Sequence, residues 1–275
     1  MSNTLPIGVF DSGVGGLTVA AEIFRNLPGE SLIYFGDTAR VPYGNKSADT
    51  IIRYSAQIVN FLEKQPVKAI VVACNTASAL ALETIKKQTD TPIIGVVEPG
   101  ARAALKQSAT RHIGLIGTAG TVSSGLYASF ISQLDSSAQV YAKACPLLVS
   151  LVEEGMINDY ITDEIVRRYI SSLVQDTDID SLILGCTHYP LLYEVIKKEA
   201  EKLLEGTGRK ITLINPAYET AVSLGELLKE KGLEAPAGTV PCHRYFVSDG
   251  ADKFTELAHK LLGLKTDEVN TVYFE

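Results

Sequence analysis

The sequence lacks several features that would point at once to a membrane or to a nucleic-acid partner. No apolar run approaches the roughly 20 residues that a membrane-spanning helix needs. The first residues carry no basic stretch ahead of an apolar segment, so we expect no secretory signal peptide. The chain has a formal net charge of −7 and no cluster of lysine and arginine, which argues against nucleic acid and anionic membranes as partners.

Cysteine is scarce, and its spacing excludes two common uses. The 4 cysteines include no C-x-x-C pair, and no second Cys/His pair joins Cys186 and His188 at the spacing of a zinc site. We therefore expect no metal, free thiols rather than disulfides, and a cytoplasmic protein. A glycine-rich turn at 13–18 is not a dinucleotide fingerprint, because Thr18 replaces the last glycine, and it lacks the lysine of a phosphate loop.

Apolar, strand-like runs alternate with helical patterns along the 275 residues, of which 46% are hydrophobic. The alternation is typical of parallel sheets that carry helices on both faces. We expect strands at 5–10, 32–35, 69–73, 93–97, 113–116, 139–142, 182–184, 211–214 and 245–247. We expect helices near 17–27, 49–64, 77–88, 99–107, 122–134, 147–156, 162–175, 190–204, 217–230 and 251–262. Asn75 or Thr76 is the expected cap of the helix at 77–88.

A weak internal repeat divides the chain into two similar units. Residues 7–13 resemble residues 113–119, and each of these glycine-containing turns is followed by a cysteine on a later strand. Two such units that face each other would leave a cleft with one cysteine on each wall. The turn residues at 98–100 are the expected crossing between the units, and residues 205–208 are a second candidate.

The segments that end at Cys74 and Cys186 carry the strongest functional signal. Each is an apolar run that stops at a cysteine, continues with small hydroxyl or amide residues and then becomes helical. Such a strand delivers its thiol to the carboxyl edge of a parallel sheet, where open α/β folds bind ligands. We expect both thiols to be exposed in the cleft, with pKa values lowered toward working pH by the helix N-termini. Two opposed acid/base groups can invert a carbon centre without a cofactor.

Asp11, Ser12 and His188 lie beside these cysteines or beside the first strand. Asp11 is expected to accept a hydrogen bond or a proton next to a thiol, and Ser12 to bind substrate, although the turn that carries them could also be purely structural. His188 follows Cys186 by two residues and is expected to orient or protonate a ligand in the cleft.

Short polar residues at helix starts form a further group of candidates. They could simply cap their helices, or they could form anion seats at the sheet edges. They are Asn75, Thr76, Thr118, Thr121 and Thr187. Tyr43 and Gly44 lie in a turn after Pro42, which could be either a loop anchor or a lid over the cleft.

Over essentially its whole length the chain resembles the glutamate racemases, cofactor-independent enzymes of bacterial cell-wall synthesis. The resemblance is carried by the motifs at residues 10–17, 34–37, 42–44, 73–77, 96–100, 151–155 and 185–190. His188 after Cys-Thr is informative, because the related aspartate racemases tend to carry an acid there. One departure is Asn215, where the family would lead us to expect Asp.

The resemblance implies an α/β fold class. It implies two similar three-layer α/β/α domains with mostly parallel sheets, related by pseudo-symmetry, with the active site in the cleft between them. The first domain would comprise residues 1–97 plus 212–275 and carry Cys74. The second would comprise residues 98–211 and carry Cys186. The family is typically homodimeric, so a homodimer is expected as well.

The resemblance also implies the chemistry. Cys74 would take the α-proton from D-glutamate and Cys186 from L-glutamate, without a cofactor, to supply D-glutamate for peptidoglycan. Three residues would assist them electrostatically or by handling protons: Asp11, Glu153 and His188. The residues expected to hold the substrate are Asp11, Ser12, Tyr43, Gly44, Asn75, Thr76, Thr118, Thr121 and Thr187.

Two other functions stay open at the level of sequence. One is a racemase for aspartate or another amino acid. The other is a two-domain binding protein whose thiols have only a structural role. The two differ in whether the α-proton of an amino acid exchanges with solvent and in which amino acid is preferred.

Overall fold

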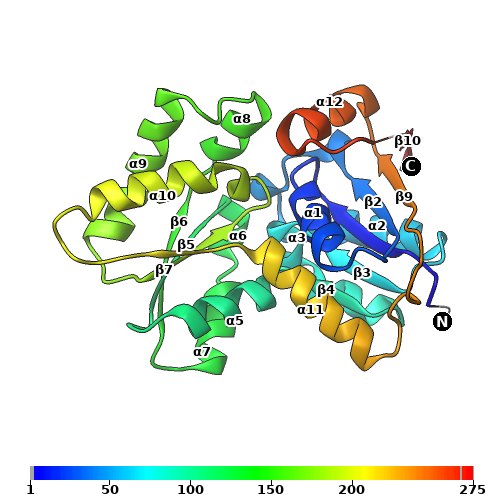
Figure 1. The fold of residues 1–275 in the computed structure, drawn as a ribbon, viewed down its shortest axis with the longest axis horizontal. Helices are drawn as coiled ribbons and strands as arrows, with labels where there is room; N and C mark the ends of the chain where they lie inside the picture. The colour runs from blue at the N-terminus through cyan, green and yellow to red at the C-terminus, as the bar shows by residue number, and fades with distance from the viewer. Residues whose placement is uncertain (1–2, 267, 275) are drawn as a thin grey trace.

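Two separate sheets organise the fold, which is described here from a computed structural model that covers residues 3–266 and 268–274 (Figure 1). The larger sheet has the strand order β10-β9-β2-β1-β3-β4, and the smaller has the order β6-β5-β7-β8. Throughout the described residues, the strand pairs of both sheets are parallel. The two parallel sheets confirm the expected fold class.

The larger sheet brings the ends of its central strands to one edge. Its strands are β1 (Ile7–Asp11), β2 (Leu32–Gly36), β3 (Ala69–Val72), β4 (Ile93–Gly95), β9 (His243–Val247) and β10 (Val269–Thr271). β1, β2 and β3 are buried along their whole length, as expected of continuous apolar runs covered on both faces. Phe10 of β1 lies in register with Phe35 of β2 and Val72 of β3. Asp11 and Cys74 therefore leave the sheet at the same carboxyl edge.

The smaller sheet repeats this arrangement. Its strands are β5 (His112–Gly117), β6 (Gln139–Ala144), β7 (Ser181–Gly185) and β8 (Thr212–Ile214). Gly117 at the end of β5 lies in register with Gly185 at the end of β7. Thr118 and Cys186 are the next residues, so they leave this sheet side by side.

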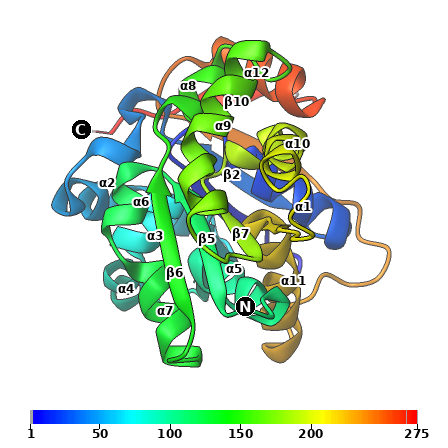
Figure 2. The ribbon, with the colours of Figure 1, turned by 90° about the vertical axis from the view of Figure 1, so that its left-hand side faces the viewer.

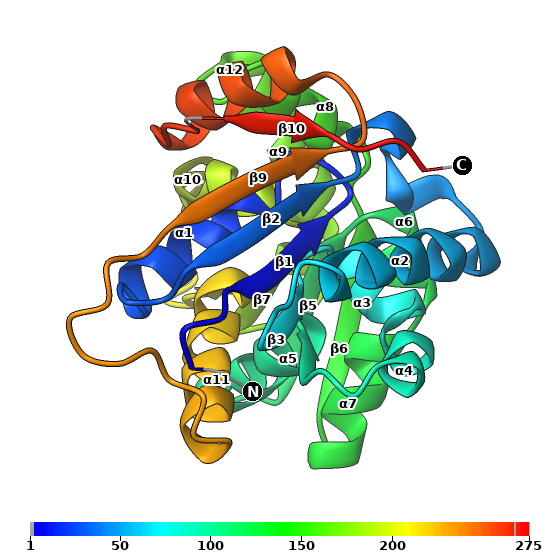
Figure 3. The same cartoon turned by 90° about the vertical axis from the view of Figure 1, so that its right-hand side faces the viewer.

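Helices cover both faces of each sheet (Figures 2 and 3). They are α1 (Leu17–Asn26), α2 (Ala48–Glu63), α3 (Asn75–Leu80), α4 (Leu82–Ile85), α5 (Val97–Gln107), α6 (Ala119–Ser123), α7 (Leu126–Leu134), α8 (Leu147–Glu153), α9 (Tyr160–Gln175), α10 (Tyr193–Leu203), α11 (Pro216–Glu230) and α12 (Ala251–Leu262). Short 3-10 turns lie at η1 (Thr38–Arg40), η2 (Tyr43–Asn45), η3 (Lys86–Gln88) and η4 (Tyr189–Leu192).

Four clusters of buried apolar side chains fill the layers, one on each face of each sheet. The alternation along β1 shows the principle, because Ile7 and Val9 enter the cluster under α1, α11 and α12, whereas Phe10 enters the cluster under α2 and α3. The result is two three-layer units, as expected. Among the described residues, no helix combines the length and the apolar character needed to cross a membrane.

The expected elements are present, with four differences. The helix expected at 77–88 is interrupted at Ala81, and the one expected at 122–134 breaks at Gly125, whose φ of 65° only glycine adopts easily. The helix expected at 190–204 begins as the 3-10 turn η4. β10 was not expected, because three residues of an edge strand give too short a pattern to detect.

The chain passes between the sheets twice. It enters the smaller sheet through α5, whose first turn contains the expected crossing at 98–100, and returns through α11, which packs against α5. The second candidate crossing at 205–208 is wrong, because the residues that follow it form β8 beside β7. For the same reason the return lies beyond residue 212. The division into domains stays a prediction, except that residues 212–214, which it assigns to the first domain, pair with the smaller sheet.

Asn215 itself has a local role. Its side-chain Oδ1 accepts a hydrogen bond from the Ala217 amide at 3.0 Å and so caps α11. Asn and Asp cap helices about equally well. The departure from the expected Asp therefore leaves the start of α11 intact.

Candidate active site

A narrow cavity of about 30 Å³ lies between the carboxyl ends of the two sheets, and both candidate cysteines line it. Its walls combine residues from both three-layer units. The lining residues are Ser12, Val41, Pro42, Tyr43, Gly44, Cys74, Asn75, Thr76, Thr118, Val149, Cys186, Thr187 and His188. The structure thus brings most of the predicted site residues together. Asp11, Thr121 and Glu153 lie outside the lining and contact the residues that form it.

Cys74 lies at the N-terminus of α3 and caps that helix itself. Its Sγ accepts a hydrogen bond from the Ala77 amide at 3.5 Å, so the expected cap at Asn75 or Thr76 is wrong: both residues already belong to the first turn. The Cys74 side chain can serve as the cap because β3 ends two residues earlier, at Val72, and Sγ reaches one of the free amides of the first turn.

The expected exposure and lowered pKa of Cys74 are also wrong. The side chain is only 5% exposed. Burial and the nearby carboxylate of Asp11 raise the pKa of the Cys74 thiol to about 12, against the smaller opposing effects of the Ala77 amide and the Ser12 hydroxyl. At neutral pH, Cys74 therefore carries its proton.

Cys186 has a different setting, although it too is buried. Its Sγ lies 3.8 Å from Nδ1 of His188, and Nε2 of the same ring lies 3.1 Å from Oε1 of Glu153. Burial opposes a charge on His188, but its contacts with Cys186 and Glu153 prevail and raise the pKa of His188 to about 10. The contact with His188 in turn lowers the pKa of Glu153. At neutral pH an imidazolium therefore lies between the sulfur and the carboxylate.

The two thiols are thus opposed in position but not matched in electrostatics. A carboxylate neighbours Cys74, which disfavours negative charge on that sulfur. An imidazolium neighbours Cys186 and supplies the positive charge that an anionic sulfur needs. The two sulfur atoms therefore lie in different electrostatic surroundings.

Asp11 is the residue around which the glycine-rich turn folds. Its Oδ2 accepts hydrogen bonds from the amides of Gly13, at 3.1 Å, and Gly16, at 2.9 Å. A Cβ at position 16 would lie only 2.3 Å from Cβ of Asp11, so only glycine fits there. Thr187 approaches Oδ1 to 3.5 Å from the other unit. Burial raises the pKa of Asp11. The amides of Gly13 and Gly16 are therefore taken up by the Asp11 carboxylate, which the turn holds at the interface between the two units.

Three threonine hydroxyls join the two units at the wall of the cavity. Oγ1 of Thr76 lies 2.9 Å from Oγ1 of Thr118 and 3.3 Å from Oγ1 of Thr121, and the last two are 3.0 Å apart. Thr118 also caps α6 by accepting from the Thr121 amide. Thr118 therefore both caps α6 and lines the cavity.

The turn at Tyr43 and Gly44 is anchored by the buried side chain of Tyr43. Tyr43 is buried, and its hydroxyl donates to the carboxylate of Asp37. Gly44 touches the opposite unit, since a Cβ there would lie 2.6 Å from Cβ of Thr118. Of the two expected alternatives, the Tyr43 side chain is a loop anchor, while the backbone of the turn reaches across to the other wall.

Several residues of the site escape detection from sequence. Val149 of α8 lines the cavity, and the Tyr127 hydroxyl of α7 donates to Oδ1 of Asn75 at 2.7 Å across the interface. An apolar residue on an amphipathic helix gives no signal of this kind, and a contact between units depends on how they pack. The residues that the structure describes contain no group of three metal-binding side chains that could hold an ion.

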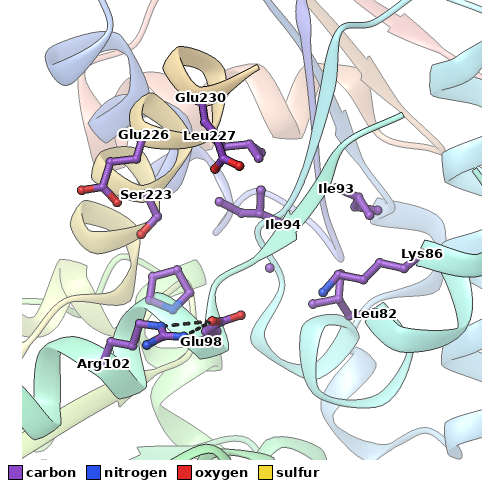
Figure 4. Close-up of a pocket in the computed structure, with 12 residues that line it drawn as sticks. Leu82, Lys86, Ile93, Ile94, Glu98, Arg102, Ser223, Glu226, Leu227 and Glu230 are labelled. Carbon is purple, nitrogen blue, oxygen red and sulfur yellow. Dashed lines mark hydrogen bonds and ion pairs between the residues drawn. The ribbon is translucent and has the colours of Figure 1, made fainter. Parts of the chain in front are cut away.

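A second and larger cavity, of about 340 Å³, lies away from the cysteines (Figure 4). It is lined by residues of α4, η3, β4, α5 and α11, among them Glu98 and Arg102, which form an ion pair. None of the predicted site residues faces it. The predicted site residues therefore gather at the small cavity and not at this larger one.

The raised pKa of His188 predicts a pH dependence of stability. The folded chain holds this proton more tightly than the unfolded chain, because the pKa rises from an ordinary 6.5 to about 10. Its contribution to the free energy of unfolding is complete below pH 6.5 and is lost as the pH rises toward 10. Denaturant titrations at pH 6.5 and at about pH 9 should show a larger fall for the wild type than for His188→Asn. An equal fall in the two proteins would contradict the assigned charge.

The chain is similar to known proteins in both sequence and structure. A sequence model of the family described as Asp/Glu/Hydantoin racemase matches residues 7–223. A glutamate racemase of Geobacter metallireducens is 45% identical over 98% of this chain and 97% of its own length. The crystal structure of glutamate racemase isoform RacE1 from Bacillus anthracis matches with a TM-score of 0.92, at 42% identity, over 98% of both chains. That of the Francisella tularensis glutamate racemase in complex with D-glutamate matches with a TM-score of 0.88, at 37% identity, over 98% of both chains.

Proposed function

The chain belongs to the glutamate racemases of the Asp/Glu/hydantoin racemase family, and on that basis we propose that it interconverts L- and D-glutamate without a cofactor, with Cys74 and Cys186 as two opposed acid/base groups. The observation that supports this most directly is that both thiols line one small cavity from different units. We propose that the D-glutamate serves peptidoglycan synthesis. A homodimer and a cytoplasmic location remain predictions from the sequence.

Racemisation requires strong stabilisation of the negative charge that forms at the α-carbon. The α-proton of an amino acid is very weakly acidic, so hydrogen-bond donors must stabilise the carbanion-like state that forms when the proton leaves. The hydroxyls and amides around the cavity are the proposed donors, and their effect grows when closure excludes water. A cavity of about 30 Å³ holds only one or two water molecules, so the two units must move apart for glutamate to enter.

The unequal settings of the thiols support an assignment of sides. From L-glutamate, Cys186 takes the α-proton onto its sulfur in this proposal, and the adjacent His188 balances the negative charge that the sulfur must carry to do so. Cys74, which holds its proton at neutral pH, delivers that proton to the opposite face of the carbon. The enzyme then carries a thiol at Cys186 and a thiolate at Cys74, which is the state that accepts D-glutamate in the reverse direction.

The remaining predicted residues take supporting roles in this proposal. Glu153 holds the His188 ring and its charge, and Asp11 acts on Cys74 electrostatically from beneath the cavity wall. Substrate atoms would contact the lining side chains of Ser12, Asn75, Thr76, Thr118 and Thr187 and the turn at Tyr43 and Gly44. Thr121 orients the hydroxyls of Thr76 and Thr118.

The substrate is tested by comparing glutamate with aspartate. Dialysed enzyme, with no cofactor added, should racemise L-glutamate with a kcat/KM well above that for L-aspartate. The reason is that the cavity pairs His188 with Cys186, where the aspartate racemases tend to carry an acid. A preference for aspartate would replace the proposed substrate. Absence of α-proton exchange with either amino acid would indicate a binding protein instead.

A further inference from the structure

The loop that follows β2 forms one wall of the small cavity. Its residues Val41, Pro42, Tyr43 and Gly44 all line the cavity, and Gly44 packs against Thr118 of the opposite unit. The position of this loop therefore sets the shape of the space between the two thiols. The contacts of the neighbouring residues determine where the loop lies.

One buried carboxylate anchors both ends of the loop. Asp37 is fully buried and accepts hydrogen bonds from the Tyr43 hydroxyl, from Nε of Arg40 at 2.8 Å to both oxygens, and from the Ser248 hydroxyl at 2.8 Å. A buried carboxylate is costly unless it is paired, and Arg40 is the ion-pair partner of Asp37, so Arg40 holds this carboxylate in place. The geometry of Tyr43 thus depends on Arg40 through Asp37.

Arg40 is in turn fixed by a clamp of aromatic rings. Its guanidinium carbon lies 4.0 Å from the ring centroid of Tyr54 and 4.7 Å from that of Phe274, and its Nη1 donates to Gln57 at 2.5 Å. Phe274 follows β10, which pairs with β9 at the edge of the larger sheet (Figure 3), and its ring also contacts Phe35 of β2, with centroids 5.4 Å apart. The segment after β10 lies more than two hundred residues from Arg40 in the sequence, and it contacts the cation that holds the loop.

We propose that Phe274 is a positioning residue for catalysis. Its ring stacks on Arg40, Arg40 holds Asp37, and Asp37 holds the hydroxyl of Tyr43, so the segment after β10 fixes the cavity wall at Tyr43 and Gly44 that contacts the bound substrate. The inference rests on the proposed function. It assigns to the last described residues a role in substrate binding in addition to their packing against the larger sheet.

The test separates ring stacking from simple packing. Phe274→Leu keeps an apolar side chain but loses the cation–π contact, and it should raise KM for glutamate by about 3–30-fold, the factor expected for such a contact when it is partly desolvated, with a smaller change in kcat. Phe274→Tyr keeps the ring and should restore KM to near the wild-type value. Tyr273→Leu is the matched control, because Tyr273 is 81% exposed and should leave KM unchanged.

A double-mutant cycle identifies the route of the effect. In an Arg40→Met background, Phe274→Leu should change KM little further, because the cation that it contacts is already gone. Additive effects of the two substitutions, or an unchanged KM in Phe274→Leu, would overturn the proposal. A failure of Phe274→Tyr to restore KM would do the same. If the wild type does not racemise glutamate at all, the proposed function fails instead, which is a separate result.

Discussion

Replacing either Cys74 or Cys186 by alanine is expected to reduce racemisation in both directions by about 10²–10⁴-fold, the range that positioned acid/base groups contribute. Inversion needs a proton acceptor on one face of the carbon and a donor on the other, and the two thiols line the same cavity from different units. Each variant therefore retains one half of a reaction that cannot proceed alone. Initial rates from L-glutamate and from D-glutamate measure the loss.

The remaining two cysteines provide matched controls. Cys242 is exposed, and Cys145 is buried outside the cavity lining, so serine at either position should leave the rate near that of the wild type. Circular dichroism and thermal unfolding show whether each variant is folded. A folded alanine variant at position 74 or 186 that keeps more than a few per cent of the wild-type rate would be incompatible with a two-thiol mechanism.

Asp11→Asn and His188→Asn are expected to impair the two directions unequally. Asp11 acts on the charge of Cys74, whereas His188 lies 3.8 Å from Sγ of Cys186. We therefore expect Asp11→Asn to slow turnover of D-glutamate more, and His188→Asn to slow turnover of L-glutamate more, by about 10²–10⁴-fold in the affected direction. The equilibrium constant fixes the ratio of kcat/KM values, so the asymmetry must be measured in kcat and KM separately or in isotope effects.

Glu153→Gln is the companion variant for the second of these effects. It keeps an oxygen that can accept from His188 Nε2 but removes the negative charge, so it should act in the same direction as His188→Asn and more weakly. Equal changes in both directions would mean that the residue only shapes the pocket. Unchanged kinetics would remove that residue from the mechanism.

The sequence was sufficient to predict the two parallel sheets and the location of both thiols at one cavity. Buried parallel strands are continuous apolar runs, and the residue after such a run must lie at the carboxyl edge, so Cys74 and Cys186 were placed by pattern alone. β10 was missed because an edge strand of three residues has only a weak pattern.

The electrostatic surroundings of the thiols could not be predicted from the sequence pattern. A helix N-terminus next to Cys74 favours a lowered pKa, and that part of the prediction has a physical counterpart in the Ala77 amide. Burial and the Asp11 carboxylate prevail over it, and both depend on how tightly the two units close. The contact of Phe274 with Arg40 could not be predicted either, because no local pattern relates residues so far apart in sequence.

The partition of solvent deuterium during the first turnovers of L-glutamate in heavy water tests the two-base proposal most directly. A thiol carries a single proton, so return from Cys186 gives back the substrate's own proton, whereas forward reaction takes a solvent-derived deuteron from Cys74. The proposal predicts deuterium at Cα of the D-glutamate formed and almost none in the L-glutamate recovered, with the mirror result from D-glutamate. Product that keeps the substrate's proton, or recovered substrate that gains deuterium as fast as product forms, would contradict it.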